Sequence, residues 1–171
     1  MSDDNIIDPY VLQLASPDVK EAFGALQVLK TRGTEALPQL LAALQGEDPS
    51  IRTMAVVVLG ELGAAADVSI PHIVELLKEE NEQLQTAAAL TLVRIGPASI
   101  PALVEAIQQD QEQDSRSWFW AVWALSFLAP SIIKEDTVHR LNRVREAGDT
   151  PLETIAAEEA LGKIIAGKLT E

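Results

Sequence analysis

The 171-residue sequence contains no cysteine. A disulfide framework, a thiolate nucleophile, a cysteine-ligated zinc and an iron–sulfur cluster are therefore excluded, and a reducing cytoplasm is the expected location. Basic residues are scarce as well, with 13 Lys and Arg against 26 Asp and Glu, a formal net charge of −13. Because nucleic acid and anionic lipid are bound through clustered basic side chains, we expect no nucleic-acid partner.

The sequence also lacks an export signal and a long apolar run. Its first ten residues are acidic and contain no basic segment followed by an apolar stretch. No segment reaches the roughly 18 uninterrupted apolar residues that a membrane span needs, so no membrane insertion is expected. Apolar residues make up 47% of the chain, too many for a disordered protein, and the length predicts a single domain, 1–171.

Small and branched apolar residues recur in the chain at intervals of 30 to 33 positions. The segment from Asp48 to Gly63 aligns with that from Asn81 to Gly96 at an offset of 33. Four units share one predicted core column, formed by Ala25 and Leu29, Ala55 and Leu59, Ala88 and Leu92, and Ala121 and Leu125. A period of this length is typical of repeat proteins built from stacked supersecondary units.

Prolines mark the start of a second helix in the first three units. Pro38, Pro71 and Pro101 each follow a glycine and precede apolar residues spaced on one helical face. Each unit therefore reads as a helix, a glycine-ended turn and a proline-started helix. Stacked units predict an all-α, right-handed α-solenoid whose concave surface is lined by second helices. The predicted repeats are 17–46, 47–80, 81–113 and 114–147, with a capping helix over 150–168.

Two units depart from this pattern. In the fourth unit Lys134 stands where the proline is expected, and a polar second helix is predicted from about Asp136 to Glu146. In the first unit a register slipped by two residues competes with the frame that aligns Gly33 with Gly63. The acidic loop 108–114 separates the third and fourth units and is expected to be mildly flexible.

The pattern Asp48–Pro–Ser–Ile–Arg52, followed by Ala55, Leu59 and Gly63, resembles a HEAT repeat, in particular the HEAT-like repeat named after phycobilisome lyases. The resemblance implies the solenoid fold and, if it carries lineage, a cyanobacterial source. It does not imply one function, because HEAT-like repeats serve many purposes.

Two HEAT-repeat activities can be tested on this sequence. HEAT-repeat deoxyhypusine hydroxylases hold di-iron on His–Glu pairs, whereas here Ile73 follows His72 and Arg140 follows His139, so no metal site is expected. HEAT-like alkylpurine DNA glycosylases have a basic groove, which an acidic chain does not offer. Bilin lyases modify a cysteine of their substrate protein, so the lack of cysteine leaves them as an alternative.

Aromatic residues are concentrated at one place. Five of the seven lie within residues 118–127. Trp120, Trp123 and Phe127 recur at +3 and +7 and form a stripe beside the core column of the fourth unit, and Trp118 is predicted to belong to the same partner-binding patch. A partly exposed stripe of this kind is typical of partner-binding surfaces. The alternative is that these rings fill a wide gap against the next helix or lie under the C-terminal helix.

Basic residues follow directly after the aromatic stripe. His139, Arg140 and Arg143 share one helical face and are predicted to bind a partner or a ligand carboxylate. The alternative is that they pair with nearby acidic residues, within the unit or in the acidic units alongside.

An acidic surface is predicted on the second helices, where His72, Glu75 and Glu105 project from the concave side. Such carboxylates suit recognition of a basic partner; the alternative is that they only keep the protein soluble. No catalytic residue is identified.

The function predicted from the sequence is a non-catalytic protein–protein interaction adaptor or assembly factor, cytoplasmic, monomeric and without a cofactor, whose partner is another protein. One alternative is a bilin lyase, isomerase or chromophore-handling subunit, with bilin as its ligand. Another is a structural subunit that oligomerises through the aromatic stripe.

Overall fold

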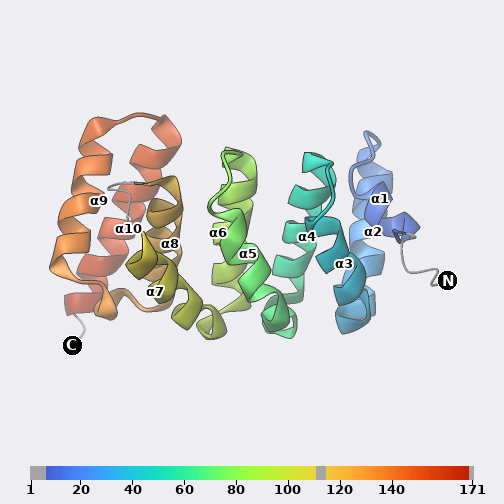
Figure 1. Ribbon diagram of the computed structural model, residues 1–171, viewed down its shortest axis with the longest axis horizontal. Helices are drawn as coiled ribbons and strands as arrows, with labels where there is room; N and C mark the ends of the chain where they lie inside the picture. Colours follow the sequence, from blue (N-terminus) through green and yellow to red (C-terminus); the bar gives the residue numbers. More distant parts are fainter. Residues whose placement is uncertain (1–6, 111–114, 170–171) are drawn as a thin grey trace.

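The computed structural model describes residues 7–110 and 115–169, which form helices and contain no strand. Helical hairpins stand side by side in chain order, with the two ends of the chain at opposite ends of the row (Figure 1). The predicted all-α solenoid is confirmed. The α-helices are α1 (Pro9–Gln13), α2 (Val19–Arg32), α3 (Leu37–Leu44), α4 (Pro49–Leu62), α5 (Ile70–Leu76), α6 (Glu82–Ile95), α7 (Ile100–Gln109), α8 (Arg116–Leu128), α9 (Glu135–Ala147) and α10 (Pro151–Leu169).

Each hairpin turns through a short 3₁₀ helix that the sequence pattern did not predict. These helices are η1 (Gly33–Ala36), η2 (Gly63–Ser69), η3 (Pro97–Ser99) and η4 (Pro130–Ile132). The first helices α2, α4 and α6 end at glycines with positive φ, 59°, 56° and 95°, and strongly negative ψ. Side chains with a Cβ rarely adopt this conformation, so glycine is required at these three turns.

Helix starts show which register the first unit adopts. The Asp18 carboxylate accepts from the Lys20 amide at the start of α2, as Asp48 accepts from the Ser50 amide at the start of α4. Asp18 and Gly33 therefore both lie 30 residues before their counterparts, Asp48 and Gly63. The frame without the slip is confirmed.

The core column lies at the centre of the stack. All eight of its members are at most 3% exposed. Helix α4 packs against α6, and α6 packs against α8, so the column is continuous across the hairpins. Burial of this apolar stripe, which no single hairpin achieves alone, holds the units together.

The segment Pro49–Leu76 is long and apolar enough to cross a membrane, because an 18-residue window within it has a mean hydropathy of 1.6. In the structure Gly63 interrupts it, and it forms the hairpin of α4 and α5. Its side chains Ala55, Leu59 and Ile73 are fully buried in the protein. We interpret its apolar character as that of a core hairpin.

The fourth unit differs from the first three in the way the sequence indicates. Helix α8 ends at Ala129 rather than at a glycine, and Lys134 occupies the N-cap position of α9. Helix α10 packs against both α8 and α9 and closes the stack. The predicted boundary at 113/114 and residues 111–114 of the acidic loop lie outside the described residues.

Helix α1 precedes the predicted repeats and was not anticipated. Its N-cap residue Asp8 receives an ion pair from Arg32 at 2.5 Å, and Arg32 lies 4.8 Å from the centre of the Tyr10 ring. Val11 within this helix and Leu14 directly after it are buried. This short helix covers the apolar side of the first hairpin.

Candidate functional site

A large open groove lies on the second-helix face, bordered by α5, α7 and the first turns of α6 and α8. Its volume is about 1030 Å³. Carboxylates dominate its charged lining, which consists of Glu75, Glu79, Glu80, Glu105 and Asp110 against the two cations of Lys78 and Arg116. We call it the acidic groove.

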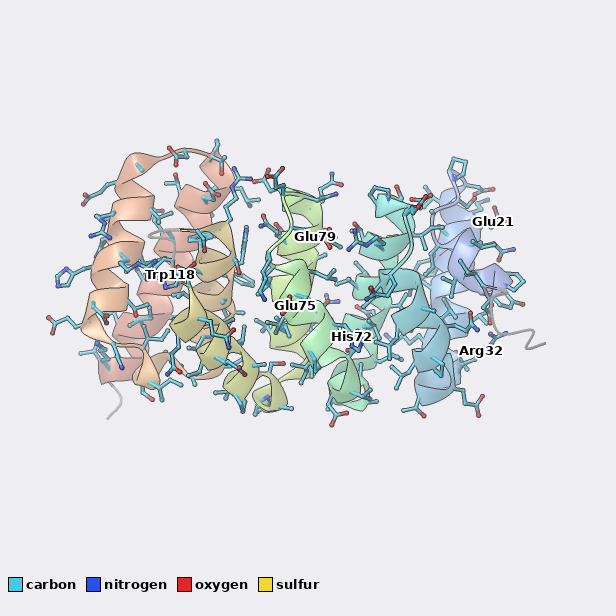
Figure 2. All side chains as sticks on the ribbon, in the orientation of Figure 1. Glu21, Arg32, His72, Glu75, Glu79 and Trp118 are labelled. Carbon is cyan, nitrogen blue, oxygen red and sulfur yellow. The ribbon has the colours of Figure 1, made fainter. Side chains whose placement is uncertain are left out.

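A smaller groove of about 300 Å³ lies one hairpin earlier, between α3 and α5. Arg52, His72, Glu75 and Glu79 border it. Glu75 and Glu79 therefore lie between the two grooves and border both. Figure 2 shows His72, Glu75 and Glu79 following one another along the middle of the stack.

The predicted acidic surface is located at these grooves. His72, Glu75 and Glu105 are all exposed, and each lines at least one groove. Lys78 pairs with Glu75 at 2.7 Å, and the Gln109 amide donates to Glu105 at 2.8 Å. The part these three residues play in partner recognition stays a prediction.

Arg52 joins the start of the second hairpin to the end of the first hairpin and to the segment that follows α5. Its Nε donates to the Leu44 carbonyl at the end of α3, 2.9 Å away. Its two terminal nitrogens pair with the Glu79 carboxylate, one of them at 2.9 Å. One half-buried guanidinium therefore satisfies a helix-end carbonyl and a carboxylate that borders both grooves.

Gln85 occupies the position equivalent to Arg52, 33 residues later. Its Nε2 donates to the Leu77 carbonyl at 2.9 Å, and Leu77 is itself 33 residues after Leu44. Because that carbonyl can only accept, the orientation of the amide is fixed and Oε1 points the other way. Gln85 is 2% exposed, and its Oε1 has no hydrogen-bond donor within the part of the chain that the structure describes.

Comparison with known proteins identifies the family. The family model for HEAT repeats matches residues 7–80. The chain is 35% identical over 161 residues to the protein SkfG of Bacillus subtilis (strain 168), an alignment that covers 94% of this chain and 92% of SkfG. This chain belongs to the SkfG family of HEAT-repeat proteins. Since SkfG comes from Bacillus, the SkfG family is not confined to cyanobacteria, and the expected cyanobacterial source is not confirmed.

Solved structures resemble this SkfG-family chain in fold. The complex of CpcE and CpcF of phycocyanin lyase from Nostoc sp. PCC7120 matches 91% of the chain with a TM-score of 0.59 and 20% identity. The chain spans 63% of that structure's chain. An engineered protein matches 92% of the chain with a TM-score of 0.50 and 20% identity. These likenesses confirm the resemblance to the phycobilisome lyase-type HEAT repeat at the level of the fold.

The aromatic stripe of this SkfG-family chain is buried, so the expectation of a partly exposed surface is wrong. Trp118, Trp120 and Trp123 are 1%, 2% and 9% exposed, and Phe127 is half-buried. Helix α10 packs against α8 and contacts two of these rings: Trp123 Nε1 donates to Glu159 at 3.2 Å, and Lys163 lies 4.8 Å from the centre of the Phe127 ring. The rings meet edge to face, Trp120 and Trp123 at 5.8 Å between centres. The alternative of coverage by the C-terminal helix therefore describes the structure.

One basic residue of α9, Arg140, lies against an aromatic ring of α8. Arg140 lies 3.9 Å from the centre of the Trp118 ring and donates to Asp110 at 3.0 Å. Asp110 also accepts from the hydroxyl of Ser115, the N-cap of α8, at 2.6 Å. Arg140 thus ties α9 to the end of α7 and the start of α8. His139 and Arg143 are exposed on α9, and ligand binding by His139, Arg140 and Arg143 stays a prediction.

Sequence reasoning missed the residues that shape the grooves from within. Arg52, Glu79 and Gln85 were not singled out, although Arg52 and Gln85 occupy the same column of the repeat alignment. The replacement of a long cation by a short neutral amide in that column was the available signal.

Proposed function

We propose that this SkfG-family protein is a non-catalytic adaptor or assembly factor of the cytoplasm that binds another protein on its second-helix face. The observation that carries the proposal is the acidic groove, whose volume of about 1030 Å³ is open at the surface and lined by five carboxylates and two cations. Such a surface attracts basic segments and gives recognition its specificity through complementary charge.

The arrangement of the carboxylates supports recognition rather than proton transfer. General acid–base catalysis needs a carboxyl group whose pKa is moved toward the working pH, usually by burial. Glu75 and Glu105 are exposed to solvent and already accept hydrogen bonds from Lys78 and Gln109. We therefore propose that these groups act through their charge.

Site-specific photo-crosslinking in the native host tests this proposal. A photoreactive amino acid is placed at His72 or Glu105 on the second-helix face, and as controls at Gln27 or Leu90, which are exposed on the first helices α2 and α6. We expect one defined protein to be crosslinked from the first pair and not from the second. Equal crosslinking from all four positions would count against a second-helix binding face.

A chromophore-handling role is the alternative, and its support is the fold likeness to the phycocyanin lyase complex. No feature of the grooves favours it over the adaptor role. Titration of the protein with phycocyanobilin distinguishes the two, because a bound bilin changes its visible absorbance. An unchanged spectrum at high micromolar protein would remove this alternative.

The oligomeric state is part of the same proposal, which takes the protein to be a monomer. An oligomer formed through the aromatic stripe would need Trp120 and Trp123 at the surface, whereas both are buried within the chain. Sedimentation equilibrium measures the state directly, and self-association at micromolar concentration would contradict the monomer.

A further inference from the structure

At two successive hairpin interfaces, equivalent helix-end carbonyls accept a hydrogen bond from different side chains. At the first, the guanidinium of Arg52 donates to the Leu44 carbonyl and also reaches the Glu79 carboxylate. At the second, the amide of Gln85 donates to the Leu77 carbonyl and extends no further. The donors that Arg52 brings to the first interface are therefore missing from the second, which is where the acidic groove opens.

The acidic groove holds hydrogen-bond acceptors in excess. Gln85 Oε1 is a buried acceptor with no donor among the described residues, and a buried polar atom left in this state costs free energy. Glu80 and Glu105 have no cation within ion-pair distance in residues 7–110 and 115–169. The site calls for a ligand that brings several donors and a positive charge.

Both cations that line the acidic groove already have a carboxylate partner within the chain. Lys78 pairs with Glu75 at 2.7 Å. Arg116 pairs at 3.2 Å with Glu153 of α10, a carboxylate that is not part of the groove lining. Neither donates a hydrogen bond to Gln85 Oε1, so the missing donors come from outside residues 7–110 and 115–169.

We propose that the acidic groove binds an arginine side chain of a partner protein, which donates to Gln85 Oε1 and to the carboxylates around it. The partner's arginine supplies in trans what Arg52 supplies within the chain at the preceding interface. A planar guanidinium has five donors and no acceptor, which matches a carboxylate-lined site better than a compact ammonium does. This inference rests on the adaptor function proposed above and names the chemistry of its partner.

A charge-matched pair of variants tests the site. The probe is a fluorescein-labelled peptide of alternating serine and arginine with four arginines, titrated against the full chain and followed by fluorescence anisotropy. In Gln85→Arg the new guanidinium takes the position that Arg52 has one unit earlier and occupies the groove from within. Gln83→Arg adds the same charge to an exposed position of α6 outside the groove.

We expect Gln85→Arg to weaken peptide binding at least tenfold and Gln83→Arg to change it less than twofold. Citrulline in place of arginine should abolish binding, lysine should weaken it, and spermine should compete poorly. Equal loss in the two variants, no binding by the wild type, or binding of spermine as tight as that of the arginine peptide would each overturn the proposal.

A second variant keeps the test decisive if Gln85→Arg does not fold, which circular dichroism will show. Glu80→Gln combined with Glu105→Gln alters only exposed side chains and should also weaken the arginine peptide at least tenfold. Unchanged binding in this variant overturns the arginine site. If the arginine peptide fails while crosslinks still form at His72 and Glu105, the adaptor function stands and only the arginine site is wrong.

Discussion

The Glu61 carboxylate on α4 accepts from Lys30 on α2 at 2.8 Å and from Arg94 on α6 at 2.6 Å. Glu61 and Arg94 occupy equivalent places in successive first helices, 33 positions apart, and Lys30 lies one residue before the equivalent place in α2. The next place in the series is Phe127 on α8, where Lys163 lies 4.8 Å from the ring centre. Contacts of this column therefore join α2 to α4, α4 to α6, and α8 to α10.

Acid should weaken the contribution of Glu61 to stability. The hydrogen bond and charge of Lys30, followed by the charge of Arg94, hold the pKa of Glu61 below its ordinary value of 4.5. The stabilisation is therefore complete above pH 4.5 and is lost as the pH falls through the lowered pKa. Glu61→Gln should lower the free energy of unfolding by less than about 1 kcal/mol at pH 7. Urea titrations at pH 7 and pH 3 check this, and a difference as large at pH 3 would contradict it.

Two glycines inside helices should respond oppositely to alanine. A Cβ at Gly60 would lie 2.8 Å from the hydroxyl of Thr91, which donates to the Val56 carbonyl, so α4 and α6 would be forced apart. Overpacking of this kind costs about 1–3 kcal/mol. A Cβ at Gly24 meets nothing within 4 Å, and Gly24→Ala should stabilise α2 by about 0.5–1 kcal/mol. Thermal unfolding of both variants gives the signs, and two shifts in the same direction would refute the expectation.

Graded substitutions at Arg52 should separate its two contacts. Arg52→Gln copies the residue of the next unit, so it should keep the bond to the Leu44 carbonyl and lose the pairing with Glu79. Arg52→Leu loses both contacts and leaves the carbonyl without its side-chain donor, at a cost of about 1–3 kcal/mol. We expect Arg52→Gln to unfold at a higher denaturant concentration than Arg52→Leu. The opposite order would show that the carbonyl contact contributes little.

Removal of a buried indole should lower the free energy of unfolding. Trp120 is 2% exposed, so Trp120→Ala leaves a large cavity beside α8 and should cost about 3–5 kcal/mol. Phe23→Ala, at a ring that is 62% exposed on α2, should change stability by no more than about 0.5 kcal/mol. Calorimetry of the two variants makes the comparison. A small shift for Trp120→Ala would mean that α10 does not hold the stripe in place in solution.

The fold could be predicted from local sequence signals. Asp48, Gly63 and Pro71 each act within a few residues of themselves, as cap, turn and helix start, and their recurrence revealed the hairpins and the core column. The 3₁₀ turns were missed because the same glycine and proline pattern also permits a direct turn. Helix α1 was missed because it lies before the first full period and is held by distant contacts, such as that of Asp8 with Arg32.

The candidate site was predicted only in part. The exposure of His72, Glu75 and Glu105 could be predicted because each lies on the outer face of a second helix that packs on one face only. The burial of the tryptophans did not, because it depends on the angle at which α10 returns across α8. Gln85 was missed for a different reason. Its significance appears only when it is compared with Arg52, which makes an additional contact with Glu79.

The shared bond from position 52 or 85 to a helix-end carbonyl also bears on how such proteins evolve. Loss of residues 47–79, one period of 33, would bring Gln85 to the place of Arg52, where its amide can donate to Leu44 as it now donates to Leu77. Unequal recombination could therefore remove or add a unit without a new interface having to be invented. Each such event would add or remove one complete groove, while the hydrogen bond that joins neighbouring hairpins would stay the same.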